Sequence, residues 1–509
     1  MTMSGVGRKS VAGIAGALLA VDVLVASVFT MSGPAPWVVA GVLLTLLGAV
    51  VLRAEYGRQR IAWLERTEPL TAPADAPEPT GVAVARFFYY AGSATIGILL
   101  LRPGGATASD LLFLISLAAV VAGLIAMNAN PAVLMPKGVI LGVLVFCVGG
   151  LITAFYAPSA TDNLGVLFRV TYLVAIWFWL GTMILTELRH VRAAMTWWVV
   201  SAAIAGAGAI AQTVLGDVIP GGTIHYGRVS GFTDHVNDLG GLAGVTVVPA
   251  LALLYKRVGA GAAQRVTAAI SLPLIGTGLI LSGSISGAMA ALASGLIWVI
   301  ATRTFIRGVL VLGLLLAVTS AIAASGISPY FQSPLQRLTM STAESGSENA
   351  TFWTRVDSYE AAWVDIRAHP LYGVGLSPGD TPTFTGSQVH NNLMKPLFEG
   401  GAFAALGMTI VYLLIGVAGW QTVVRARSPE DHLLSLAALC SYIAYFTWGL
   451  SQPALFKRFG WMSGALVLAL WAQQLRAVRM LERAQLPAPP PAPAPRALPR
   501  LRPRQPVQP

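Results

Sequence analysis

Long apolar segments separated by short polar loops recur along the whole chain. Each segment is close to 20 residues long, enough for an α-helix to cross a bilayer core of about 30 Å. The pattern predicts an all-α fold, a polytopic transmembrane helical bundle of about 12–14 spans. The fourteen predicted spans lie near 11–31, 35–52, 83–101, 109–127, 138–156, 164–185, 195–214, 236–255, 266–282, 285–302, 307–325, 399–420, 432–450 and 459–475.

Every cluster of positive charge in the short loops follows an even-numbered span. By the positive-inside rule, the side that collects these loops is cytoplasmic, and with an even number of spans both termini lie there too. The clusters are Arg53, Arg58, Arg60 and Arg66; Arg189 and Arg192; Lys256, Arg257 and Arg265; Arg303 and Arg307; Arg425 and Arg427; and Arg476, Arg479 and Arg483.

The spacing of the spans divides the chain into five parts. Two of these parts contain proline-rich segments that we expect to lie in the cytoplasm without a packed core, namely the linker at 68–80 and the tail. The parts are 1–82, an N-terminal transmembrane pair with a Pro/Ala linker; 83–325, a transmembrane core; 326–398, a large outer loop; 399–480, the C-terminal transmembrane helices; and 481–509, the tail.

The large outer loop should itself contain structure, because a structureless loop of about seventy residues is unusual. Its segment "FWTRVDSYEAAWVDIRAH" (352–369) places apolar and aromatic residues at helical spacing. We expect an amphipathic helix that lies on the bilayer or packs over the spans. Its apolar face consists of Phe352, Val356, Tyr359, Trp363 and Ile366.

The composition agrees with a membrane protein: 55% of the residues are hydrophobic and only 11% are charged. The net charge of +11 is explained by basic loops, so we expect no nucleic-acid partner. Cys147 and Cys440 lie inside apolar runs and form no metal-binding pattern. Because no Asp-x-Asp occurs in the outer loops and no P-loop occurs anywhere, we expect neither a metal nor another cofactor.

Candidate chemistry gathers on the predicted outer side. The stretch "GSQVHNNLMKPLFEGG" (386–401) places His390, Asn391, Lys395 and Glu399 at the start of an apolar run. A neutral imidazole near pH 7 can take a proton from a hydroxyl, although His390 at a helix start also suits simple capping. Lys395 and Glu399, four residues apart, suit a structural ion pair.

Arginines remain on this side despite the positive-inside rule. A guanidinium group forms bidentate hydrogen bonds with phosphate oxygens and stays positively charged at any physiological pH. The arginines therefore suggest an anionic ligand such as a lipid diphosphate. For Arg228 alone, pairing with lipid headgroups is the alternative, and for Arg355 a solvated charge. The site candidates of this kind are Arg169, Arg228, Arg337 and Arg355.

Three segments in sequence order resemble motifs of the O-antigen ligase and polymerase superfamily. They are "GRVSGFTDHVNDLGGLAG", which resembles an Arg-x-x-Gly…Asn segment; "TRVDSYEAAWVDIRAHPLYGVG"; and "HN", nine residues, then Gly401. The resemblance covers about 225–420. The last glycine of the third motif is replaced by Ala404, and "SGSISGA" (282–288) lacks an arginine that relatives often carry.

The resemblance implies a metal-independent, inverting glycosyltransferase in the bacterial inner membrane. It would transfer a glycan from undecaprenyl diphosphate to lipid A–core or another surface acceptor, within lipopolysaccharide and cell-envelope synthesis. By matching position, Arg228 and Arg355 would hold the diphosphate, while His390 would orient or deprotonate the acceptor, supported by Asn391. We add Lys395, Arg169 and Arg337 as substrate-binding candidates.

Several other functions remain open from the sequence. A polysaccharide polymerase would use the same donor chemistry, and a related cell-wall glycosyltransferase has a similar layout. A transporter or flippase for lipid-linked sugars would show internal repeats and charges at mid-membrane, which this chain lacks. A non-catalytic scaffold would give no reason for arginines beside His390.

Overall fold

The structure is a computed structural model. It describes residues 80–99, 107–126, 134–216, 219, 222, 224–225, 227–304, 351–377, 382–386 and 388–485. The predicted N-terminal pair of spans, residues 68–79 of the linker, the span near 307–325, Arg337 and residues 486–509 of the tail lie outside the described residues. Residues 481–485, predicted to belong to the tail, are instead helical.

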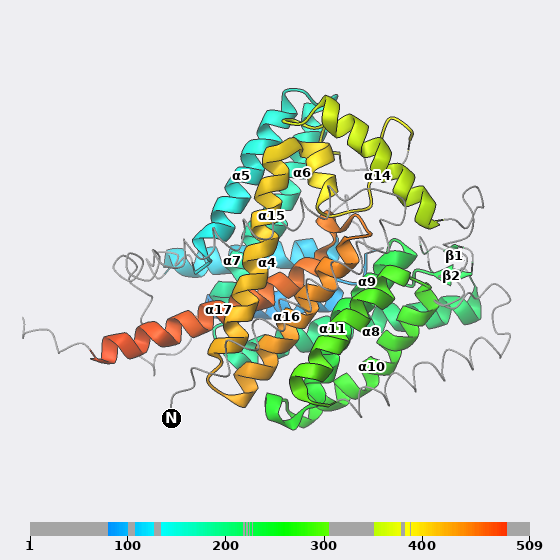
Figure 1. Cartoon of the computed structure of the whole chain (residues 1–509). Helices are drawn as coiled ribbons and strands as arrows, with labels where there is room; N and C mark the ends of the chain where they lie inside the picture. Colours follow the sequence, from blue (N-terminus) through cyan, green and yellow to red (C-terminus); the bar gives the residue numbers. More distant parts are fainter. Residues whose placement is uncertain are drawn as a thin grey trace, which may run out of the picture.

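Helices make up nearly all of the described chain, as predicted (Figure 1). The π-helical turn Tyr172–Ile176 joins α6 to α7, and Lys256–Val258 and Ala454–Phe456 are short 3₁₀ turns. The α-helices are α3 (Thr80–Thr95), α4 (Ala108–Ala126), α5 (Lys137–Ala154), α6 (Ala160–Thr171), α7 (Trp177–Ile184), α8 (Leu188–Leu215), α9 (Val236–Leu254), α10 (Ala262–Ser282), α11 (Ile285–Thr302), α14 (Thr351–Ala368), α15 (Met394–Arg425), α16 (Pro429–Gly449) and α17 (Arg458–Gln485).

Every predicted span that falls on described residues coincides with a helix. Among the described residues, eight helical segments are long and apolar enough to cross a membrane. The predicted spans near 83–101, 432–450 and 459–475 correspond to α3, α16 and α17, which are not among the eight. Helix α3 falls short because it has only 16 residues. Helix α16 begins with the polar residues Pro-Glu-Asp-His, which lower its apolar character.

A small β-hairpin occupies the loop between α8 and α9, where the sequence predicted no strand. Strands β1 (Ile224–His225) and β2 (Arg228–Val229) pair antiparallel, with His225 opposite Arg228. Two residues per strand give no alternating pattern long enough to recognise in a sequence. The hairpin places Arg228 at the edge of the helical bundle.

The candidate residues gather at one end of the bundle, which we call the α14 end. It comprises α14, the start of α15 with the preceding residues 388–393, the hairpin, the turn between α10 and α11, and the turn between α16 and α17. In Figure 1, α14 and the hairpin lie on the same side of the molecule, and α15 begins beside α14.

Close contact between α5 and α15 positions the start of α15. A Cβ on Gly407 would lie 2.3 Å from the Phe146 backbone nitrogen and 2.6 Å from the Gly142 carbonyl oxygen. The two backbones therefore approach this closely because Gly407 and Gly142 carry no side chains. The interior beside α15 is aromatic, with the Tyr412 and Trp461 rings stacked at a centroid distance of 5.3 Å.

Gly407→Ala should force α5 and α15 apart and lower the free energy of unfolding by about 1–3 kcal/mol. Thermal unfolding of the purified protein in detergent measures this. Gly295→Ala on α11 is the matched control, because a Cβ there meets no atom within 4 Å. Equal melting temperatures for the two variants would contradict the close-contact account.

Candidate functional site

Helix α14 covers the segment that carries His390. Ala362 and Ile366 of α14 pack in a small buried cluster with Val389 and Phe398. The helix predicted in this segment is thus confirmed, and Trp363 and Ile366 of its predicted apolar face pack on the protein.

Tyr359 of α14 connects directly to the candidate base. Its hydroxyl donates to the His390 carbonyl oxygen at 2.8 Å. Burial raises the pKa of the Tyr359 phenol to about 12, although the positive charge of Arg355 favours the ionised form. The phenol therefore stays protonated and keeps donating at any working pH. Arg355 lies on α14 one turn before Tyr359.

Asn391 and Asn392 bind this segment to the turn between α16 and α17. Asn391 Oδ1 accepts from the backbone nitrogens of Leu393 and Met394 at 2.8 and 3.0 Å, and so caps α15. Its Nδ2 donates to the Leu450 carbonyl oxygen at 3.0 Å. Asn392 Oδ1 accepts from the Ala454 backbone nitrogen at 2.8 Å.

The first turns of α15 contain a buried ion pair and a kink. Lys395 Nζ lies 2.7 Å from Glu399 Oε1, with side chains only 1% and 0% exposed, so the predicted structural pair is confirmed. Gly401 has φ +70°, a conformation that side chains disfavour, and the helix bends there. The Ala402 nitrogen then donates to the Pro370 carbonyl oxygen, which fastens the bend to the end of the α14 segment.

Arg228 lies beside the start of α9 and the turn between α10 and α11, and it is only 6% exposed. Its Nε donates to the Ser282 carbonyl oxygen at 2.7 Å, and Nη2 donates to Asn237 Oδ1 at 2.5 Å. Asn237 is in the first turn of α9, and Ser282 ends α10 just before α11 begins. A Cβ on Gly287 would lie 2.5 Å from the Gly240 backbone, so the starts of α9 and α11 touch. Helix N-termini carry partial positive charge and favour anions.

The turn between α16 and α17, residues 450–458, binds both the elements around Arg228 (the Arg228 group) and the segment that carries His390 and Asn391 (the His390 group). Gln452 Oε1 accepts from Asn237 Nδ2, and Gln452 Nε2 donates to Ser286 Oγ, both at 3.3 Å. Since the Leu450 carbonyl oxygen accepts from Asn391, the Arg228 group and the His390 group are bound to the same turn.

Aromatic and ionic contacts hold the rest of the 450–458 turn. The Phe456 ring centroid lies 5.3 Å from the Arg169 guanidinium carbon and 6.0 Å from Lys395 Nζ, within cation–π range. Lys457 pairs with Asp238 at 2.7 Å. Arg458 binds both carboxylate oxygens of Asp110, at 2.6 and 2.5 Å.

The predicted residues thus fall at one end of the bundle, and the 450–458 turn or α14 connects them. Six of the seven candidates are placed there: His390, Asn391, Lys395, Arg169, Arg228 and Arg355. The sequence did not reveal Asn237, Gln452 or Phe456 as part of the site. A polar "SQP" (451–453) between two apolar runs was the available signal for Gln452.

Two other features bear on binding. Among the described residues, no three His, Cys, Asp or Glu side chains come together as possible metal ligands.

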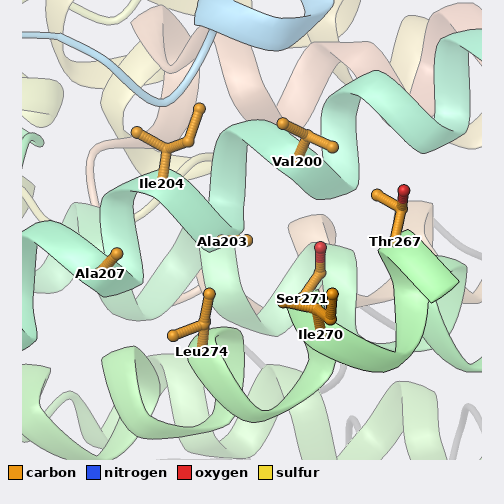
Figure 2. Close-up of a pocket in the computed structure, with 8 residues that line it drawn as sticks. All are labelled: Val200, Ala203, Ile204, Ala207, Thr267, Ile270, Ser271 and Leu274. Atoms are coloured by element: carbon orange, nitrogen blue, oxygen red, sulfur yellow. The ribbon is translucent and has the colours of Figure 1, made fainter.

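A separate pocket of about 280 Å³ lies between α8 and α10 (Figure 2). It contains none of the predicted site residues and has Thr267 and Ser271 as its polar members. Its lining is Val200, Ala203, Ile204, Ala207, Thr267, Ile270, Ser271 and Leu274.

Removing one partner of the Lys395–Glu399 pair should leave a buried charge. We expect Lys395→Met to lower the free energy of unfolding by about 3–5 kcal/mol, and the double variant Lys395→Met/Glu399→Gln to regain much of this loss. Thermal unfolding in detergent measures both. A double variant as unstable as the single one would contradict the buried-pair interpretation.

Comparison with protein families places part of this site in a known group. Residues 270–409 match the model of the family described as O-antigen ligase, a region that contains the second half of α10, α11, α14, the His390 segment and the start of α15. A search of curated proteins found no match. The chain is therefore a multi-pass membrane protein that contains a domain of the O-antigen ligase family.

Proposed function

We propose that the protein is an inverting membrane glycosyltransferase of the O-antigen ligase type. It transfers a glycan from undecaprenyl diphosphate to lipid A–core or another surface acceptor, at the outer face of the bacterial inner membrane. The observation that carries the proposal is that one turn connects a buried arginine, at the start of α9, to the His390 segment. An anion-binding group and a candidate base are what transfer from a diphosphate donor requires.

Arg228 and the starts of α9 and α11 form the donor side. A diphosphate placed there would meet a guanidinium and two helix N-termini, which stabilise the negative charge that develops on the leaving group. Arg355 and Arg169 add positive charge from α14 and α6. Lys395 forms an ion pair with Glu399 in the structure. It would therefore contribute to donor binding by its contact with Phe456 of the 450–458 turn, not by a direct ion pair with the diphosphate.

His390 and Asn391 form the acceptor side. In the transfer step, the bond between the sugar C1 and the phosphate oxygen breaks while the acceptor oxygen bonds to C1 from the opposite face. The proton of the acceptor hydroxyl passes to the His390 imidazole, and undecaprenyl diphosphate leaves with the bonding electron pair. The donor's own activation drives the step, so neither a nucleotide nor a metal is required.

The proposed orientation follows from loop charge. With the basic loops in the cytoplasm, the α14 end faces outward, where a lipid-linked glycan donor and a lipid-anchored or glycan acceptor meet. The five-part organisation of the chain stays part of this proposal, with residues 326–398 as the outer loop that delivers α14 and His390. Membrane lipids surround the bundle.

His390→Ala should lower glycan transfer by about 10²–10⁴-fold, the usual contribution of a general base. The assay incubates purified protein with a lipid-linked glycan and candidate acceptors in the presence of EDTA and detects a mobility shift of the acceptor. His432→Ala is the matched control, because His432 lies on α16 at the end where Arg425 and Arg427 lie.

Full transfer by His390→Ala would show that this residue takes no part in the chemistry. Loss of wild-type transfer in EDTA would contradict metal independence. A product ladder on the lipid-linked chain would identify a polymerase instead.

Tyr359→Phe should lower transfer several-fold, because the phenol no longer holds the His390 carbonyl, at a net cost of about 1 kcal/mol. Since the Tyr359 phenol has a pKa of about 12, the contribution of this bond should be the same from pH 6 to 10. The ratio of wild-type to variant rates across this range measures it. A ratio that falls as the pH rises would contradict a protonated Tyr359.

A further inference from the structure

Gln452 is a buried amide that no sequence motif marks and that lies outside the matched residues 270–409. Its side chain is 3% exposed. Its oxygen accepts from Asn237 Nδ2 and its nitrogen donates to Ser286 Oγ, each at 3.3 Å. Both ends of the amide are therefore used, and each bond reaches a different helix N-terminus.

Hydrogen bonds to Arg228 and to Gln452, on opposite sides, fix which way the Asn237 amide faces. Asn237 Oδ1 accepts from Arg228 Nη2 while Asn237 Nδ2 donates to Gln452. If the Asn237 amide turned over, its NH₂ would face the guanidinium, and two donors would oppose each other. The acceptor Gln452 Oε1 on the other side of the amide favours the same orientation and holds the Asn237 side chain in place.

The other end of the Gln452 amide binds the start of α11. Ser286 Oγ accepts from Gln452 Nε2 and lies 3.1 Å from the hydroxyl of Ser284, whose oxygen caps α11 at the Gly287 backbone nitrogen. A continuous series of hydrogen bonds thus runs from the α11 cap through Gln452 and Asn237 to Arg228.

We propose that Gln452 is a positioning residue that orients the anion-binding Arg228 relative to His390. It acts on Arg228 through Asn237, while the Leu450 carbonyl oxygen, two residues before Gln452, holds Asn391 of the acceptor side. The inference rests on the proposed function and adds that donor and acceptor groups are aligned by one side chain of the 450–458 turn.

The test uses the full-length protein in detergent, with undecaprenyl diphosphate as the binding probe. Gln452→Met preserves length and apolar bulk but removes both hydrogen-bonding groups. We expect the Kd for undecaprenyl diphosphate to rise about 3–10-fold, the change that corresponds to losing one buried hydrogen bond. Binding equal to that of the wild type would overturn the inference.

A double-mutant cycle separates positioning from a general loss of structure. If Gln452 acts through Asn237, then Gln452→Met should change the Kd less than about twofold when Asn237→Ala is already present. The same fold-change on both backgrounds would show that Gln452 acts independently of Asn237 and would also overturn the inference.

Two further variants make the outcomes distinguishable. Gln474 is another buried amide, with Nε2 2.8 Å from the Thr422 carbonyl oxygen and within 3.2 Å of Asp431, between α15, α16 and α17. Gln474→Met should bind the probe as the wild type does. If Gln474→Met loses as much probe binding as Gln452→Met, the Gln452 effect is one of stability, and the inference fails.

Arg228→Ala should lose probe binding. If it does and Gln452→Met does not, only the positioning inference fails; if Arg228→Ala binds normally, the diphosphate site of the proposed function fails as well.

Discussion

Polar groups buried at the end of a membrane bundle must be hydrogen-bonded, because neither lipid nor bulk water reaches them. At the α14 end the 450–458 turn meets this requirement for several elements at once. It binds Asn391 through a backbone carbonyl, Asn237 and Ser286 through Gln452, and two aspartates through Lys457 and Arg458. The relative placement of Arg228 and His390 depends on this one turn.

The cations of the α14 end are held by defined contacts. Lys395, Lys457 and Arg458 each form an ion pair with a carboxylate, and these pairs fix α15 and the turn in place. Arg228 donates to the Ser282 carbonyl oxygen at the end of α10 and to the Asn237 amide oxygen in the first turn of α9. These bonds hold the guanidinium beside the start of α9, where we propose that the donor diphosphate binds.

Much of this architecture could be predicted from the sequence, because apolar length marks membrane helices strongly. The predicted spans within the described residues coincide with helices, and the spacing of Tyr359 and Ile366 predicted α14 correctly. The ion pair of Lys395 and Glu399 followed from their i, i+4 spacing. Gln452 and Asn237 could not be found this way, since their partners lie 215 residues apart in the chain and only folding brings them together. The hairpin at Arg228 was too short to leave a pattern.

The most direct test of the account is an experimental structure of the full chain with bound undecaprenyl diphosphate. The account predicts the diphosphate within hydrogen-bonding distance of the Arg228 guanidinium, at the starts of α9 and α11 and on the same side of the bundle as the His390 imidazole. A diphosphate bound at another place, such as the apolar pocket between α8 and α10, would contradict it.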